Sequence, residues 1–211
     1  MDYLNFLNDD EKNLGEPFKL PEKIVLASAS PRRRELIGKI VSDYEMTVAD
    51  SEEILPCDID VLKAPEYLAK IKADAVSKIL PGRVIIGCDT VVISDNKILG
   101  KPLDENDAER MLKSLSGKTH FVVSGVCITD GEYEDVFSSL TKVTFKKLTE
   151  KEIREYVASG DPMDKAGAYG IQSGAGRFVE AVDGSLYNVI GFPIKQIKEH
   201  LLVLFSKKHE K

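Results

Sequence analysis

A short segment, SASPRRR at residues 28–34, places three arginines directly behind a serine–proline step, after the apolar run IVLA. Ser30 suits the N-cap of a helix, and proline suits the first helical position because its missing N–H has no intrahelical partner there. We expect the backbone N–H groups near Ser28 and Ser30 to converge with guanidinium groups, Arg32 and Arg33 among them, on one anion. The segment indicates a phosphate-binding corner. A solvated strand–helix turn and a kinase target site are the alternatives that it leaves open.

A carboxylate stands inside an otherwise apolar strand. The run RVIIGCDTVVI at residues 83–93 is apolar on both faces except for Asp89. Burying a lone carboxylate is costly unless cations, hydrogen bonds or a metal compensate its charge. Capping of a neighbouring helix is the structural alternative, but we favour a general base or metal ligand that faces a gap left by Gly87.

Two lysines and a second carboxylate are candidates for the same site. In the helix expected over 65–80, Lys72 falls within the apolar face, where a lysine that merely extends to solvent is the commoner alternative. Lys101 lies on a loop close in sequence to the apolar strand. Glu53 follows an earlier strand and indicates little by itself, because acidic surface residues are common.

A glycine-punctuated loop near the end of the chain, DKAGAYGIQ at 164–172, carries both charges. The amide of Gln172 both donates and accepts hydrogen bonds, as the reading of a nucleobase edge requires. An ordinary flexible loop is the alternative.

The composition limits the class of protein. With 211 residues, of which 43% are hydrophobic, the chain has enough material for one large domain or two small lobes around a cleft. A formal net charge of −6 argues against nucleic acid as a partner, whereas a small anionic substrate needs only a few local cations. We see no signal peptide, no membrane-spanning run and no metal-ligand spacing among the three cysteines, and we expect a cytoplasmic protein without a membrane partner.

The pattern of elements predicts an α/β fold with a mixed, largely antiparallel sheet, flanking helices and two lobes around a central cleft. Residues 1–22 are expected to form a polar extension, and 23–207 the domain. The expected strands are 23–28, 44–49, 83–94, 119–129, 133–147 and 177–190, and the expected helices are 31–39, 65–80, 104–115, 150–159 and 194–205.

Taken together, these segments resemble the Maf family of nucleoside triphosphate pyrophosphatases. The blocks that carry the resemblance run in family order and are SASPRRREL (28–36), EE (52–53), GCDTVV (87–92), GKP (100–102), LSGKTH (115–120), DPMDKAGAYGIQ (161–172) and NVIGFP (188–193). The resemblance implies a two-lobed fold related to inosine-triphosphate pyrophosphatases, and cleavage between the α- and β-phosphates. Cys88 and Ser173 stand where the family commonly has alanine and glycine.

The resemblance also implies roles for single residues. Asp89 matches the catalytic acidic residue, and Glu53, Lys72 and Lys101 match further active-site positions. The combination of Arg32, Thr90 and Gln172 is similar to that of the branch that hydrolyses dTTP and UTP. A homodimer is expected from the family, and a nucleotide-sensing regulator of growth or division is the rival function.

A mechanism follows from these expectations. Mg²⁺ or Mn²⁺, held by Asp89 and Glu53, would polarise the α-phosphate while Asp89 activates water. Lys72, Lys101 and Arg33 would stabilise the charge that develops on the phosphates.

Overall fold

The computed structural model describes residues 3–209, which form one seven-stranded sheet with helices on both of its faces. The sheet order is β2-β1-β3-β5-β6-β7, and β4 pairs with β3 off this path. β1, β2 and β3 run parallel, whereas the remaining pairings are antiparallel. The mixed, largely antiparallel sheet expected from the sequence is therefore confirmed. The strands are β1 (Ile24–Ala27), β2 (Tyr44–Thr47), β3 (Ile85–Ser94), β4 (Lys97–Leu99), β5 (Thr119–Thr129), β6 (Glu134–Phe145) and β7 (Val179–Asp183).

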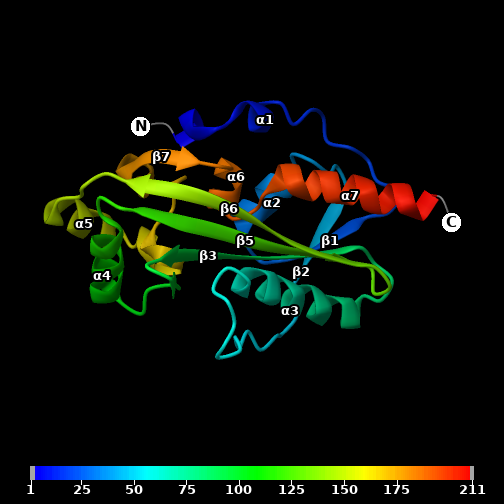
Figure 1. Ribbon diagram of the computed structural model, residues 1–211. Helices are drawn as coiled ribbons and strands as arrows, with labels where there is room; N and C mark the ends of the chain where they lie inside the picture. The colour runs from blue at the N-terminus through cyan, green and yellow to red at the C-terminus, as the bar shows by residue number, and fades with distance from the viewer. Residues whose placement is uncertain (1–2, 210–211) are drawn as a thin grey trace.

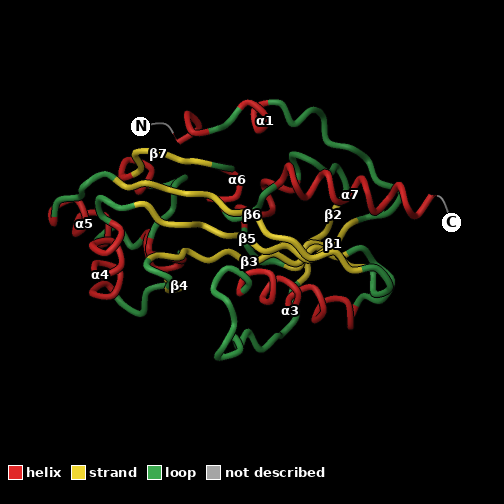
Figure 2. Tube along the Cα trace, in the orientation of Figure 1, coloured by secondary structure: helices red, strands yellow, loops and turns green. Residues whose placement is uncertain are grey.

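The helices gather at the two ends of the long strands β3, β5 and β6, which gives the molecule two lobes (Figure 1). α2 and α7 lie above one end of the sheet and α3 lies below it, whereas α4 and α5 lie at the other end (Figures 1 and 2). The helices are α1 (Asp9–Lys12), α2 (Pro31–Ile37), α3 (Ala64–Ile79), α4 (Glu105–Leu115), α5 (Glu150–Val157), α6 (Leu186–Ile190) and α7 (Ile194–His209). Short 3₁₀ segments are η1 (Tyr3–Phe6), η2 (Asp161–Asp164), η3 (Ala166–Ala168) and η4 (Gly174–Phe178).

The centre of β3 has a strand on one side only. β1 pairs with β3 as far as Gly87, and β4 pairs with it from Val92 onward. Between these pairings, residues 88–91 bond to β5 but to no other strand of the described chain. Asp89 therefore lies at an open edge within the sheet, where a ligand can approach it.

Two glycines let helix α3 approach the sheet closely. A Cβ atom added at Gly87 would lie 2.1 Å from the Ala69 carbonyl oxygen, and one at Gly125 would lie 2.1 Å from the Pro65 carbonyl carbon. Only glycine permits such contacts between a strand and a helix backbone. Gly125 is the β5 partner of Asp89, so α3 crosses beside this carboxylate. The prediction that Gly87 leaves an open gap is therefore wrong, because α3 fills it.

The strand expected over 177–190 is wrong in its second half. β7 ends at Asp183, and Leu186–Ile190 form helix α6 instead. The Ser185 hydroxyl accepts a hydrogen bond from the Asn188 N–H and caps this helix, and Gly191 ends it in the left-handed region at φ 109°. The two-residue turn at Asp95 and Asn96, both with positive φ, starts the short strand β4 that sequence reasoning missed.

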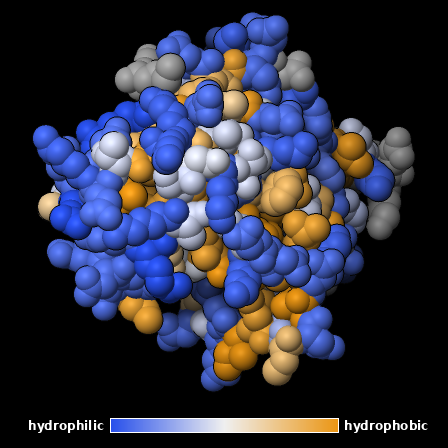
Figure 3. Space-filling model, turned by 60° about the vertical axis from the view of Figure 1, so that its left-hand side comes forward, coloured by the Kyte–Doolittle hydropathy of each residue, from blue (hydrophilic) through white to orange (hydrophobic). Residues whose placement is uncertain are grey.

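Hydrophilic side chains cover most of the face shown in Figure 3, with hydrophobic residues in separate groups between them. Within residues 3–209, the helices fall short of the length and apolar character that a membrane span requires.

Candidate active site

Two adjoining cavities of about 450 and 440 Å³ lie where the two lobes meet. Both are lined by Ser30, Arg32, Arg33, Lys72 and Lys101. The first cavity adds Asp89, Thr90 and Gln172, and the second adds Ser28 and Glu53. The structure thus gathers around one cleft all ten residues that the sequence singles out, although they come from six separate stretches of chain.

Lys72 joins the two candidate carboxylates. Its ammonium forms an ion pair with Asp89 and lies 3.1 Å from Glu53 Oε2. The side chains of Lys72 and Asp89 are 20% and 15% exposed. Lys72 belongs to α3, Asp89 to β3, and Glu53 to the loop after β2. The inward-facing lysine is therefore the partner that makes the partly buried Asp89 charge tolerable.

The serines of the SASPRRR segment shape the turn into α2. The Ser28 hydroxyl accepts a hydrogen bond from the Ser30 N–H at 3.1 Å, and the Ser30 hydroxyl accepts one from the Arg33 N–H at 3.4 Å. Ser30 is the N-cap, and Pro31 occupies the first turn, as the sequence predicts. The serine hydroxyls therefore satisfy the Ser30 and Arg33 N–H groups, and anion binding by the other backbone N–H groups near Ser28 and Ser30 stays a prediction.

Arg33 is fixed by contacts with distant segments. Its Nε donates to the Gly191 carbonyl at 2.9 Å, Nη1 to the Cys88 carbonyl at 2.6 Å and Nη2 to the Thr90 hydroxyl at 3.2 Å. These contacts use three of the five N–H donors of a guanidinium group, which leaves two that can point into the cleft. The result is a positive charge with a fixed place beside the open edge of β3.

Arg32 is held more loosely. Its guanidinium lies 3.9 Å from the Asp164 carboxylate, and its side chain is 37% exposed. Such an arginine can change partner when an anion enters, because an exposed pair contributes little stability.

Thr90 also has a fixed orientation. Its hydroxyl lies 2.9 Å from the Ser124 hydroxyl and 3.3 Å from the Gly191 carbonyl. Ser124 in turn donates to the Asn188 carbonyl of α6 at 3.2 Å. The wall of the first cavity is thus a polar network that joins β3, β5 and the end of α6.

A sequence profile described as "Maf-like protein" matches residues 23–204 of the chain. The chain therefore belongs to the Maf-like family. It is 46% identical over 187 residues to the dTTP/UTP pyrophosphatase of Clostridium botulinum (strain Kyoto / Type A2), an alignment that covers 86% of the chain and 96% of that relative. It is also 46% identical over 178 residues to the dTTP/UTP pyrophosphatase of Bacteroides thetaiotaomicron, covering 83% of the chain and 92% of the relative.

The structure of the Staphylococcus aureus Ham1 protein shares the fold, with a TM-score of 0.52 and 16% sequence identity. The match covers 90% of the chain and 100% of that protein. It supports the two-lobed architecture that the sequence predicts, and at this identity it says nothing more.

Four further residues support the Gln172 loop in this Maf-like protein, and sequence reasoning left them out of the site. Asp161 accepts hydrogen bonds from Tyr156, at 2.5 Å, and from Ser173. Lys165, whose side chain is 11% exposed, lies 3.0 Å from Asp161 Oδ1. Burial opposes ionisation of Asp161, but the hydrogen bonds from Ser173, Tyr156 and Lys165 outweigh it and lower the pKa of this carboxyl. The alternation of charged and small residues in this loop is the sequence feature that could have indicated their part in the site.

Proposed function

We propose that this protein hydrolyses dTTP and UTP, or closely related pyrimidine triphosphates, to the nucleoside monophosphate and pyrophosphate. The observation that carries the proposal is the convergence of ten predicted residues on two adjoining cavities, with Lys72 joining Asp89 to Glu53. The dTTP/UTP pyrophosphatases to which the chain is similar support the choice of substrate. Removal of unwanted nucleotides from the cellular pool is the role that we infer.

A divalent cation, Mg²⁺ or Mn²⁺, belongs to the proposal. Asp89 and Glu53 supply carboxylate oxygens, the ligands that these hard ions prefer, and both already approach one cationic atom, Lys72 Nζ. Within the described residues, no group of three or more His, Cys, Asp or Glu side chains is arranged around a metal position. Phosphate oxygens of the substrate would complete the coordination, as is usual for Mg²⁺. When bound, the cation would neutralise phosphate charge as the bond breaks.

The side chains themselves divide the remaining work. Asp89 accepts a proton from the water whose oxygen bonds to the α-phosphorus, and the bond from that phosphorus to the bridging oxygen breaks. Lys72 holds the Asp89 carboxylate in place through their ion pair before substrate enters. Lys101 and Arg33, which both line the two cavities, compensate the charge on the departing pyrophosphate.

The proposed nucleobase pocket is part of the first cavity. Gln172 lines the first cavity together with Arg32 and Thr90. The Thr90 hydroxyl is oriented by Ser124 and Gly191, so its role is to present a fixed surface to the base. The amide of Gln172 supplies both a donor and an acceptor to the edge of a pyrimidine.

We further infer a cytoplasmic location, since the three cysteines are free thiols, as is usual in a reducing compartment. A homodimer stays a prediction.

The experiment is a screen of ordinary and modified nucleoside triphosphates with Mg²⁺ and Mn²⁺ that identifies both products, with the Asp89→Asn variant beside the natural chain. Asparagine keeps the size of Asp89 but removes the proton acceptor and the anionic ligand. We expect a loss of turnover of at least ~10²-fold with substrate still bound. A chelator should abolish turnover, and added Mg²⁺ or Mn²⁺ should restore it.

Three results would contradict the proposal: near-normal turnover by Asp89→Asn, release of free phosphate with a diphosphate product, or nucleotide binding without hydrolysis. The last result would support the rival function, a nucleotide sensor.

A further inference from the structure

A carboxylate from the N-terminal extension is buried against the helix that borders the proposed nucleotide site. Glu11 belongs to α1 and is 3% exposed. It lies outside residues 23–204, which the family profile matches. Figure 1 shows the N-terminal segment crossing the molecule above α6 and α7. The Lys198 ammonium holds the same segment to α7 through the Leu14 carbonyl at 2.6 Å.

The Glu11 carboxylate accepts hydrogen bonds from the start of α6. The Ser185 hydroxyl and the Tyr187 N–H, at 3.0 Å, donate to Oε1, and the Leu186 N–H donates to Oε2 at 3.1 Å. These N–H groups belong to the first turn of a helix and have no intrahelical partner. Glu11 therefore satisfies both N–H groups, and together with the Ser185 hydroxyl they give its buried carboxylate three hydrogen bonds from the start of α6.

The turn that carries Glu11 is itself fixed. The Asn8 side chain accepts a hydrogen bond from the Glu11 N–H at 2.9 Å and donates to the Gly184 carbonyl at 3.3 Å. In return, the Asn8 N–H donates to Glu11 Oε2 at 3.3 Å. The extension is thus attached to the β7–α6 turn at two points, one exposed and one buried.

The C-terminal end of α6 contacts two residues of the candidate site. The Gly191 carbonyl, directly after the helix, accepts hydrogen bonds from Arg33 and Thr90. Midway along α6, the Asn188 amide donates to the Val122 carbonyl at 3.0 Å and to the Thr141 hydroxyl at 2.9 Å. These contacts link Glu11 at the start of α6 to Arg33 at its end through a helix of only five residues.

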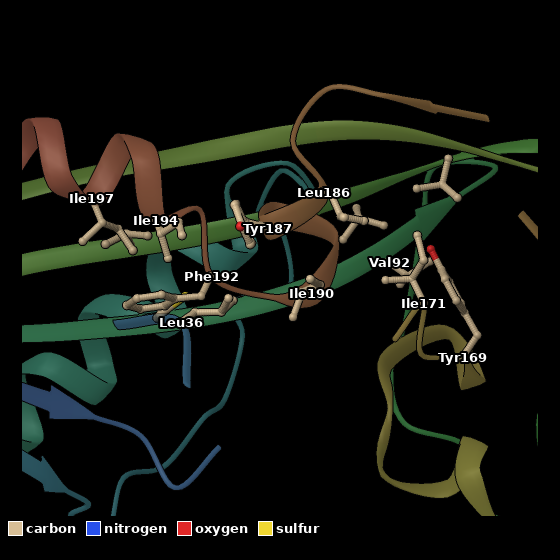
Figure 4. Packing of buried hydrophobic residues seen from close by; sticks show 14 of the residues in the cluster. Leu36, Val92, Tyr169, Ile171, Leu186, Tyr187, Ile190, Phe192, Ile194 and Ile197 are labelled. Carbon is tan, nitrogen blue, oxygen red and sulfur yellow. The ribbon is translucent and has the colours of Figure 1, made fainter. Parts of the chain in front are cut away.

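Hydrophobic packing shows why α6 depends on such contacts. In Figure 4, Ile190 and Leu186 lie between one group formed by Leu36, Phe192 and Ile194 and a second group formed by Val92, Ile171 and Tyr169. The helix has only five residues, Leu186–Ile190, too few to be stable without its neighbours. Its position is therefore set by packing between the two groups and by the polar contacts at its ends.

We propose that Glu11 is a positioning residue for the nucleotide site: the N-terminal extension fixes α6, and α6 fixes Arg33 and Thr90 through the Gly191 carbonyl. The proposal rests on the proposed function for the identity of the substrate. It makes the extension a working part of the enzyme, since it supplies from residue 11 a contact on which the binding wall depends.

The test compares Glu11→Gln with Glu16→Gln, a matched control at an exposed position of the same extension. Glutamine keeps the size of Glu11, but its NH₂ group cannot accept a hydrogen bond, so at least one donor of α6 loses its partner. We expect KM for dTTP to rise about 10-fold in Glu11→Gln with kcat within about 3-fold of the natural chain, and no change in Glu16→Gln. The assays are run well below the melting temperature of each variant.

Two further measurements keep the proposal open to refutation. The first is the Kd of a non-hydrolysable α,β-methylene analogue of dTTP, measured by calorimetry, which should rise with KM. It reports on Glu11 even if the natural chain hydrolyses neither dTTP nor UTP, the result that would overturn the proposed function alone. The second is the Asn8→Ala variant, which removes the exposed contact with Gly184 and the hydrogen bond from the Glu11 N–H, and should raise both KM and Kd by about 3-fold.

Unchanged KM and Kd in Glu11→Gln, with only a lower melting temperature, would overturn the proposal, because Glu11 would then contribute to stability alone. If Glu11→Gln does not fold, Asn8→Ala decides: nucleotide affinity equal to that of Glu16→Gln would refute the positioning role.

Discussion

Replacing Gly87 with alanine tests whether the close approach of α3 to the sheet sets the geometry of Lys72 and Asp89. The added Cβ atom would lie 2.1 Å from the Ala69 carbonyl oxygen, whereas ordinary contact begins at 3.4 Å. The obstacle is helix backbone, which cannot rotate away. Relief therefore requires α3 to move from the sheet by about 1.3 Å or the strand to bend by a similar amount.

Both stability and activity should fall. Overpacking of this kind costs roughly 1–3 kcal/mol, which for a chain of this size lowers the melting temperature by about 2–12 °C. Lys72 lies three residues beyond Ala69 on the same helix and moves with it. Because a misplacement of about 1 Å in a catalytic site can reduce the rate by up to ~10²-fold, we expect kcat/KM to fall by about 10–100-fold.

The assay is steady-state release of pyrophosphate from dTTP, with melting followed by calorimetry on the same samples. Gly100→Ala is the matched control, since a Cβ atom added there meets nothing within 4 Å. Activity of Gly87→Ala within about 3-fold of that of Gly100→Ala, despite a lower melting temperature, would refute the reasoning that α3 must lie this close for Lys72 to act.

Two other predictions concern fixed polar groups. In Arg33→Lys, a single ammonium cannot contact Gly191, Cys88 and Thr90 together. We therefore expect kcat/KM to fall at least about 10-fold and the melting temperature to fall as well. Equal values of both quantities in Arg33→Lys and in Arg34→Lys, a control at an exposed position, would contradict this expectation. Burial lowers the pKa of His120 from 6.5 to about 4, and its Nε2 lies 2.8 Å from the Tyr169 hydroxyl. Between pH 6.5 and pH 4 the unfolded chain therefore binds more protons than the folded chain. The contribution of neutral His120 to the free energy of unfolding is fully present above pH 6.5 and is lost as the pH falls toward 4. At pH 5 the loss is about 2 kcal/mol, so urea unfolding of His120→Gln should show a flatter decline between pH 7 and 5, and an unchanged slope would show that other groups cause it.

Local sequence predicted the elements that local rules control. Ser30 and Pro31 start α2 as expected, and α5 begins within the helix expected over 150–159, with a capping box formed by Thr149 and Glu152. These assignments succeed because a cap involves residues three apart in the chain. The helix cap at Ser185 was not recognised. The predicted strand over 177–190 therefore extended across the residues that form α6.

The residues of the candidate site were also predictable from the sequence. An aspartate in an apolar strand and a lysine on the apolar face of a helix each imply a partner, because a buried charge needs one. The resemblance to a known family, which the order of the motifs carries, implies that both residues belong to one active site. The contacts by which Lys72 joins Asp89 and Glu53 agree with that expectation.

What only the tertiary structure decided is how these residues are held. Arg33 and its acceptor Gly191 are 158 positions apart, and Glu11 lies 176 positions from Tyr187. No periodicity or cap reports such pairings, since they depend on how whole elements pack. The open edge of β3 likewise depends on packing. The pairing of β1 with β3 ends at Gly87, and the pairing of β4 with β3 begins only at Val92. The sequence alone thus determined which groups carry charge and which local turns form, whereas the packing of distant segments determined which of those groups face the cleft.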